Sequence, residues 1–134
     1  MTTSSGGTQG ARILIIEDNV DSADTMQMLL SISGYDARTA YDGDSALEVA
    51  REFKPEVVLC DIGLPGRDGY QVARALRELT ETRDALLVAL TGYGHDEDRQ
   101  RATDAGFDAF QVKPVEPDAL QALLAKHLSE RAGR

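Results

Sequence analysis

The sequence predicts a doubly wound α/β domain, in which helices cover both faces of one five-stranded parallel sheet. Strand-like and helix-like segments alternate five times along the 134 residues, and the connections between them are short. The segments 12–16, 57–60 and 85–90 are apolar almost throughout, which indicates strands buried on both faces. With 42% apolar residues, a chain of this length is expected to form one domain with a substantial core.

The helices are predicted from apolar residues at helical spacing and from the signals at their ends. The first is expected over 20–33, ending at Gly34, which suits a left-handed helix cap. Its expected core face consists of four residues at helical spacing: Ala23, Met26, Leu29 and Leu30. The other helices are expected over about 42–53, 70–79, 95–105 and 117–128. The helix 95–105 has few apolar anchors, because only Ala102 and Ala105 are apolar.

The two remaining strands are expected over 35–40, which has an edge-like composition, and over 107–112. In so short a chain, the flavodoxin-like strand order 2-1-3-4-5 is favoured over a six-stranded dinucleotide-binding sheet. No G-x-G-x-x-G pattern follows the first strand, so a nucleotide site would lack its phosphate cradle. In this order the loops after strands one, three, four and five meet at one edge of the sheet.

Chemically reactive residues stand where these strands end. Glu17 and Asp18 follow the first strand, Asp61 the third, Thr91 the fourth and Lys113 the fifth. Because ligands bind at the carboxyl ends of the strands in open α/β sheets, we expect these side chains to converge. Three crowded carboxylates would raise one another's pKa unless a divalent cation lay among them.

Oxygen ligands of this kind suit Mg²⁺, which takes about six of them and keeps several waters. Asp18, Asp61 and the backbone carbonyl of Gly63 are the expected direct ligands, with Glu17 acting through water. A lysine that neutralises oxygens and a threonine that donates to them suit in-line transfer of a phosphoryl group, with Asp61 as nucleophile. Hydrolysis of free substrates is disfavoured, because Gly63 replaces the second aspartate of the D-x-D pattern of aspartate-nucleophile phosphatases.

Composition limits the partners. A net charge of -9 argues against non-specific binding to nucleic acid. No stretch of about 18 apolar residues and no signal segment is present, so a membrane span is not expected and a cytoplasmic location is. The single cysteine, Cys60, excludes an internal disulfide and reads as core filler inside an apolar run.

On these residues the chain resembles the receiver domains of two-component response regulators, over about residues 11–129. The acidic pair of that family falls on Glu17 and Asp18, its phosphoacceptor aspartate on Asp61 and its switch hydroxyl on Thr91. The resemblance therefore implies that Asp61 accepts a phosphoryl group with the help of Mg²⁺.

The resemblance extends to the last strand. The lysine of the family and the cis-bonded proline after it fall on Lys113 and Pro114. The switch aromatic falls on Phe110, which has no hydroxyl to hydrogen-bond. The segments 90–94 and 106–110 are most similar to receivers attached to hybrid sensor kinases.

The resemblance implies a signalling phosphoacceptor rather than an enzyme, with a histidine kinase or histidine phosphotransfer protein as donor. The surface of the fourth helix, fifth strand and fifth helix would then respond to phosphorylation, with a phosphorylation-linked dimer as one outcome and the downstream target left open. Two alternatives stay open: an unphosphorylated pseudo-receiver acting as a constitutive interaction module, and a small metal-dependent phosphatase. The filled acidic and lysine positions weigh against the pseudo-receiver.

Further expectations concern the ends of the chain and the docking face. Residues 1–10 are predicted to be a disordered leader, 11–129 the receiver domain, and 130–134 a flexible tail. On the first helix, Ser22, Thr25 and Met28 recur on a face turned away from the core. A phosphotransfer helix bundle is expected to dock there, with Met28 as an apolar contact.

Overall fold

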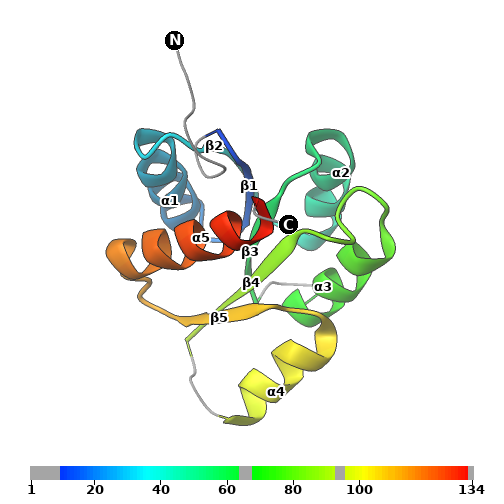
Figure 1. Cartoon of the computed structure of the whole chain (residues 1–134). Helices are drawn as coiled ribbons and strands as arrows, with labels where there is room; N and C mark the ends of the chain where they lie inside the picture. The colour runs from blue at the N-terminus through cyan, green and yellow to red at the C-terminus, as the bar shows by residue number, and fades with distance from the viewer. Residues whose placement is uncertain (1–9, 64–67, 93–95, 133–134) are drawn as a thin grey trace.

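The computed structural model describes residues 10–63, 68–92 and 96–132, and strands and helices alternate along them (Figure 1). The strands are β1 (Arg12–Ile16), β2 (Asp36–Ala40), β3 (Val57–Asp61), β4 (Leu86–Thr91) and β5 (Ala109–Val112). The helices are α1 (Val20–Ile32), α2 (Gly43–Phe53), α3 (Gly69–Glu78), α4 (Asp96–Ala105) and α5 (Pro117–Ala132).

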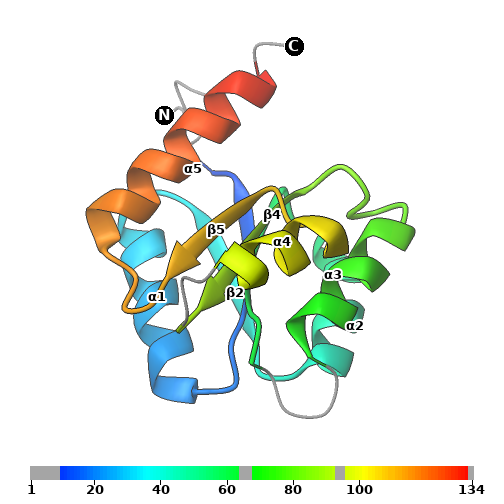
Figure 2. The same ribbon diagram turned by 90° about the horizontal axis from the view of Figure 1, so that it is seen from below.

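The five strands form one parallel sheet in the order β2-β1-β3-β4-β5, which confirms the predicted fold class and strand order. Helices α1 and α5 lie together on one face, and α2, α3 and α4 lie on the other (Figure 2). Every residue of β3 and β4 is buried, as the apolar runs predict for strands covered on both faces. Among the described residues, no helix is long and apolar enough to span a membrane.

The two faces of the sheet are packed by alternate residues of the same strands. Leu14 and Ile16 of β1 face the cluster under α2, α3 and α4, whereas Ile13 and Ile15 face the cluster under α1 and α5. Because both sets are apolar, the strand shows no alternation in sequence although its side chains alternate in space.

Most predicted boundaries hold to within one or two residues, although α5 continues to Ala132, four residues past the predicted end. The start of β5 shows one reason for a difference. The last strand was expected from residue 107 but begins at Ala109. The amide of Phe107 donates to the carbonyl of Ala102, so this residue still belongs to the cap of α4. Its side chain is buried in the core under α4. In the sequence, an apolar residue next to the strand could not be distinguished from a residue of the strand.

The core face predicted for α1 is partly wrong. Ala23 and Leu30 are buried and Met26 packs against them, but Leu29 is 41% exposed. Adjacent residues on a helix are turned by about 100°, so Leu29 cannot share the narrow contact stripe of Leu30. In α5, Leu120, Leu124 and Leu128 are buried against the sheet.

Candidate functional site

Four strand ends bring the predicted site residues to one edge of the sheet. Asp61 and Thr91 are the last residues of β3 and β4, and Glu17 directly follows β1. Backbone hydrogen bonds extend the sheet past the strands, from the amide of Glu17 to Ala40 at 3.0 Å and from the amide of Lys113 to Thr91 at 2.7 Å. These bonds hold the residues after β1 and β5 level with the ends of their neighbours.

The carboxylates of Glu17, Asp18 and Asp61 form a cluster in which one oxygen from each lies within 4.8 Å of the others. Glu17 and Asp61 are buried, with 3% and 8% of their surface exposed, whereas Asp18 is exposed. The cluster therefore has two inner carboxylates and one that faces solvent.

Lys113 provides the positive charge of the site. Its Nζ donates to Oε1 of Glu17 at 2.6 Å and lies 3.3 Å from Oδ2 of Asp61. Burial alone would lower the pKa of Lys113, but the hydrogen bond to Glu17 and the charge of Asp61 outweigh it and raise the pKa. The ammonium group is thus held in its charged form between two carboxylates.

Glu17 is anchored on both sides. While Lys113 contacts Oε1, the other oxygen, Oε2, accepts from the amide of Asn19 at 3.2 Å. Asn19 in turn is the N-cap of α1 and accepts from the amide of Ser22 at 2.9 Å. Burial raises the pKa of Glu17, and it outweighs the opposing effect of the hydrogen bond from Lys113. One lysine therefore does not fully offset the cost of keeping this carboxylate charged and buried.

Asp61 is held by the loop that follows it. Its Oδ1 accepts from the amide of Gly63 at 3.0 Å. Gly69, at the start of α3, approaches the same strand end so closely that an added Cβ would lie 2.6 Å from the carbonyl oxygen of Asp61 and from Cα of Ile62. Sequence reasoning missed Gly69, although a glycine in the first turn of a helix lowers helix stability and can therefore indicate a close backbone approach. Gly69 directly follows Asp68, the N-cap of α3.

Thr91 and Phe110 share one side of the sheet. Phe110 pairs with Ala89 of β4, and Thr91 is two residues beyond Ala89, so all three point toward the α4 face. Thr91 is buried, while Phe110 is partly buried beneath Arg99 of α4, whose guanidinium carbon lies 4.8 Å from the ring centroid. The peptide bond between Lys113 and Pro114 is cis.

The donor set of the cluster fits a hard divalent cation. Opposite ligands on Mg²⁺ are about 4.2 Å apart at bond lengths of about 2.1 Å, so oxygens gathered within 4.8 Å need only a small adjustment. Asp18, the exposed member of the cluster, and Asp61 stay the predicted direct ligands, and Glu17, held by Lys113 and the amide of Asn19, stays the predicted ligand through water. The Gly63 carbonyl as a third ligand stays a prediction.

A groove with a volume of about 640 Å³ opens beside the site, between α1 and the segment from Lys113 into α5. Ser22 and Thr25 line it, as expected for the docking face. Met28 does not: it is 63% exposed but lies outside the lining, where Met26 and Leu29 supply the apolar surface.

Fold and site together define a class: a small parallel α/β domain with an acidic cluster and a lysine at the carboxyl edge of its sheet. The response regulator receiver domain matches residues 13–125, and the chain belongs to that family. It is therefore a signalling domain of two-component systems rather than a classical enzyme.

Similar proteins span most of the chain. A receiver domain protein (CheY-like) from Methanospirillum hungatei JF-1 has 27% identity and a TM-score of 0.85, covering 92% of this chain and 97% of its own. The receiver domain of sensor histidine kinase PA1611 from Pseudomonas aeruginosa PAO1 has 29% identity and a TM-score of 0.81, covering 89% and 98%. That structure has a magnesium ion coordinated in its active site cleft. An uncharacterized 14.6 kDa protein from Leptolyngbya boryana is 30% identical over 115 residues, 86% of this chain and 88% of the relative.

Proposed function

We propose that this chain is the phosphoacceptor of a two-component phosphorelay and that it accepts a phosphoryl group on Asp61 from a histidine kinase or a histidine phosphotransfer protein. The observation that carries this proposal is the placement of Asp61 between the other two carboxylates and Lys113. A merely structural aspartate at a strand end needs neither a partly buried lysine partner nor two more carboxylates beside it.

In the proposed step an oxygen of Asp61 attacks the phosphorus of a phosphohistidine in line with the bond to nitrogen. The P–O bond forms as the P–N bond breaks, and the electron pair stays on the imidazole of the donor protein. Mg²⁺, bound by Asp18 and Asp61, would supply positive charge at the phosphoryl oxygens. Lys113 adds a second positive charge, since its Nζ lies 3.3 Å from Oδ2 of Asp61.

Glu17 is a positioning residue in this scheme. Its contacts with Lys113 and with the amide of Asn19 fix the lysine relative to the start of α1. The raised pKa of Lys113 keeps that side chain protonated across the physiological range, which suits charge neutralisation and not proton transfer.

The proposed response runs through the α4 side of the sheet. A phosphoryl group on Asp61 would attract the hydroxyl of Thr91, and Phe110, on the same side two residues along the paired strand, would move into the space released. The surface formed by α4, β5 and α5 would then change, and we propose that a downstream partner recognises this changed surface.

The donor is proposed to dock on the groove between α1 and the start of α5. Glu17 and Lys113 lie in its lining, so a histidine presented there would reach the site. We replace the expected contact Met28 by Leu29, since Leu29 is both exposed and part of the lining. Leu29→Lys should therefore slow transfer from the donor protein, and Met28→Lys should serve as its matched control.

The domain is proposed to span about residues 11–129. The match over 13–125 supports this range, and α5 continues beyond it to Ala132. The predicted leader falls outside the described residues except for Gly10, whereas residues 130–132 of the predicted tail belong to α5.

The test is incubation with a small phosphodonor, such as acetyl phosphate, with and without Mg²⁺, followed by intact mass measurement. The expected result is a mass gain of one phosphoryl group that requires Mg²⁺ and is absent from Asp61→Asn. A folded wild-type protein without any mass gain would favour the alternative, an unphosphorylated interaction module.

A further inference from the structure

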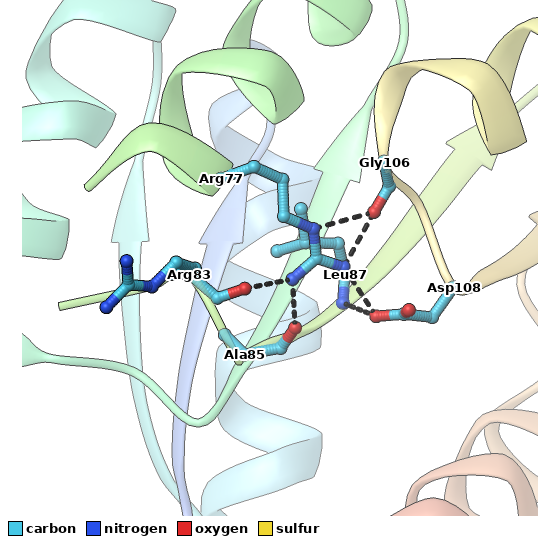
Figure 3. Close-up of polar contacts among 6 residues, drawn as sticks. All are labelled: Arg77, Arg83, Ala85, Leu87, Gly106 and Asp108. Carbon is cyan, nitrogen blue, oxygen red and sulfur yellow. Dashed lines mark hydrogen bonds and ion pairs between the residues drawn. The ribbon is translucent and has the colours of Figure 1, made fainter. Parts of the chain in front are cut away.

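Arg77 is on the last turn of α3, at the edge of the sheet opposite to the acidic site, where β4 and β5 begin. Every N–H of its guanidinium group donates a hydrogen bond. Figure 3 shows the group pointing into a ring of acceptors. Nε and one N–H of Nη2 donate to the carbonyl of Gly106 at 2.9 and 2.6 Å, and Nη1 donates to the carbonyls of Arg83 and Ala85 at 2.9 and 2.7 Å. The fifth donor pairs with the carboxylate of Asp108 at 2.7 Å.

In this arrangement Arg77 has no N–H left to bind a ligand, and its role is to hold neighbouring segments together. A guanidinium group has five N–H donors, and all five are occupied by acceptors of the chain itself. Three of the five bonds reach the turn between α4 and β5, and the other two reach the connection from α3 to β4. Arg77 therefore joins the C-terminal end of α4 to two neighbouring elements.

The same turn is fixed by backbone bonds. Gly106 has a φ of +113° and, with Phe107, forms a Schellman cap: their amides donate to Thr103 and Ala102. Asp108 pairs with Leu87 of β4 in both directions, through its amide at 2.8 Å and through its carboxylate at 3.0 Å.

The part of α4 before Ala102 is held quite differently. Among the described side chains of this helix, the buried ones are Ala102 and Ala105, and both lie in its C-terminal half. The preceding turn is held to its neighbours by two arginine–aromatic contacts. Arg99 lies over Phe110 of β5 at 4.8 Å, and Arg101 over Tyr70 of α3 at 4.2 Å. Such contacts are weaker and easier to exchange than a saturated hydrogen-bond cluster.

We propose that Arg77 makes the turn 106–108 a stationary hinge, so that a change started at Thr91 moves α4 as far as about Arg101, while this turn between α4 and the responding strand β5 stays in place. Arg77 is thus a positioning residue that limits how far the response spreads. The inference rests on the proposed phosphorylation of Asp61 for the origin of the change, and on the contacts above for its limit.

The first test is hydrogen exchange of the full wild-type chain with and without beryllium fluoride and Mg²⁺, a phosphoryl mimic. Exchange is expected to change at the amides of Gln100 and Arg101 and to stay constant at those of Gly106, Phe107 and Asp108. Equal changes in both groups would overturn the hinge.

The second test compares Arg77→Lys with Arg74→Lys, a matched change at an exposed arginine one turn earlier on α3. Lysine keeps the charge but cannot make the forked contacts. With the mimic, the boundary of the exchange change on α4 should shift from Ala102 into the amides of residues 106–108 in Arg77→Lys and not shift in Arg74→Lys. The comparison is made between two states of one variant, so a uniform loss of stability does not move the boundary. An unmoved boundary in folded Arg77→Lys would refute the role of Arg77.

The resting protein separates this inference from the proposed function. Without the mimic, the amides at Gly106 to Asp108 should exchange more slowly than those at Gln100 and Arg101, and Arg77→Lys should remove this difference. A missing gradient in the wild type contradicts the hinge. A clear gradient together with no response to the mimic supports the hinge and contradicts the proposed phosphorylation.

Discussion

At the scale of single residues, the site is built from groups that oppose one another electrostatically. Two buried carboxylates, Glu17 and Asp61, share Lys113, and Asp18 adds a third negative charge at the surface. The pKa of Glu17 is raised because its burial outweighs its ion pair. A cluster with this surplus of negative charge is ready to gain a cation, and its stability without one is reduced by the repulsion between Asp18 and Asp61.

Asp18→Asn tests the balance between binding and stability. The change removes a predicted Mg²⁺ ligand but also one negative charge from the cluster. Mg²⁺ affinity should fall by about tenfold or more, the scale on which changes around metal sites act, and phosphorylation should slow with it. Thermal stability of the metal-free protein should stay equal or rise. A much lower melting temperature with unchanged affinity would contradict the assignment.

Gly69→Ala tests the close approach of α3 to the end of β3. An added Cβ would meet backbone atoms of Asp61 and Ile62 at 2.6 Å, so the helix or the strand end must shift. A cost of about 1–3 kcal/mol in the free energy of unfolding is expected, as for overpacked sites. Urea denaturation measures it. Gly92→Ala is the control, since an added Cβ there has no neighbour within 4 Å among the residues that the structure describes. Equal stability of the two variants would show that the contact is not limiting.

At the scale of the elements, the helices differ in how firmly they are attached. The described part of α4 buries two alanines, whereas α5 buries three leucines worth about 1.5–3 kcal/mol each. The two arginine–aromatic contacts of α4 add only about 0.5–1 kcal/mol each at an exposed site.

Native-state hydrogen exchange should therefore show a lower opening free energy for the middle of α4 than for α5 in the resting protein. The amides of Gln100 and Arg101 and those of Leu124 and Leu128 are suitable probes. Protection of α4 equal to that of α5 would mean that contacts other than side-chain burial hold it.

The cap of α2 gives a pH dependence with a definite sign. Asp42 accepts from the amide of Ser45 at 2.8 Å, and this backbone hydrogen bond lowers the pKa of Asp42 below its ordinary value of 3.8. A carboxylate with a lowered folded-state pKa stabilises above its unfolded pKa, and this contribution is lost as pH falls through the folded value. Asp42→Asn keeps the acceptor oxygen without the charge. The difference in unfolding midpoint between the two proteins should be constant near pH 7 and shrink below about pH 4; a constant difference down to pH 2 would contradict it.

The strands and helices could be predicted from the sequence because long apolar runs and end signals agree with the tertiary structure. The misassigned residues are those whose environment is set by a neighbouring element. Leu29 satisfies the helical spacing of α1 but lines the groove beside α5. Phe107 is apolar and buried, but its backbone amide belongs to the cap of α4 and not to a strand. Arg77 carried no signal at all, since its partners are mostly backbone carbonyls of turns, which any residue type can supply.

At the scale of the whole molecule, the sheet separates two tasks. The groove beside α1 and α5 offers access to the acidic site, while Thr91, Phe110 and α4 lie on the opposite face. The location of the site could be predicted because parallel strands end at one edge. The division between the faces could not, because it depends on which alternate residues of β1, β3 and β4 meet which helices.

The position of the phosphoryl group tests the central claim most directly. Wild type and Asp61→Asn are treated with acetyl phosphate and Mg²⁺, trapped with borohydride, which reduces an aspartyl phosphate to homoserine, and mapped by peptide mass spectrometry. The account predicts homoserine at position 61 of the wild type, dependent on both donor and Mg²⁺, and none elsewhere in either protein. Trapping at a different residue, or equal labelling of Asp61→Asn, would contradict it.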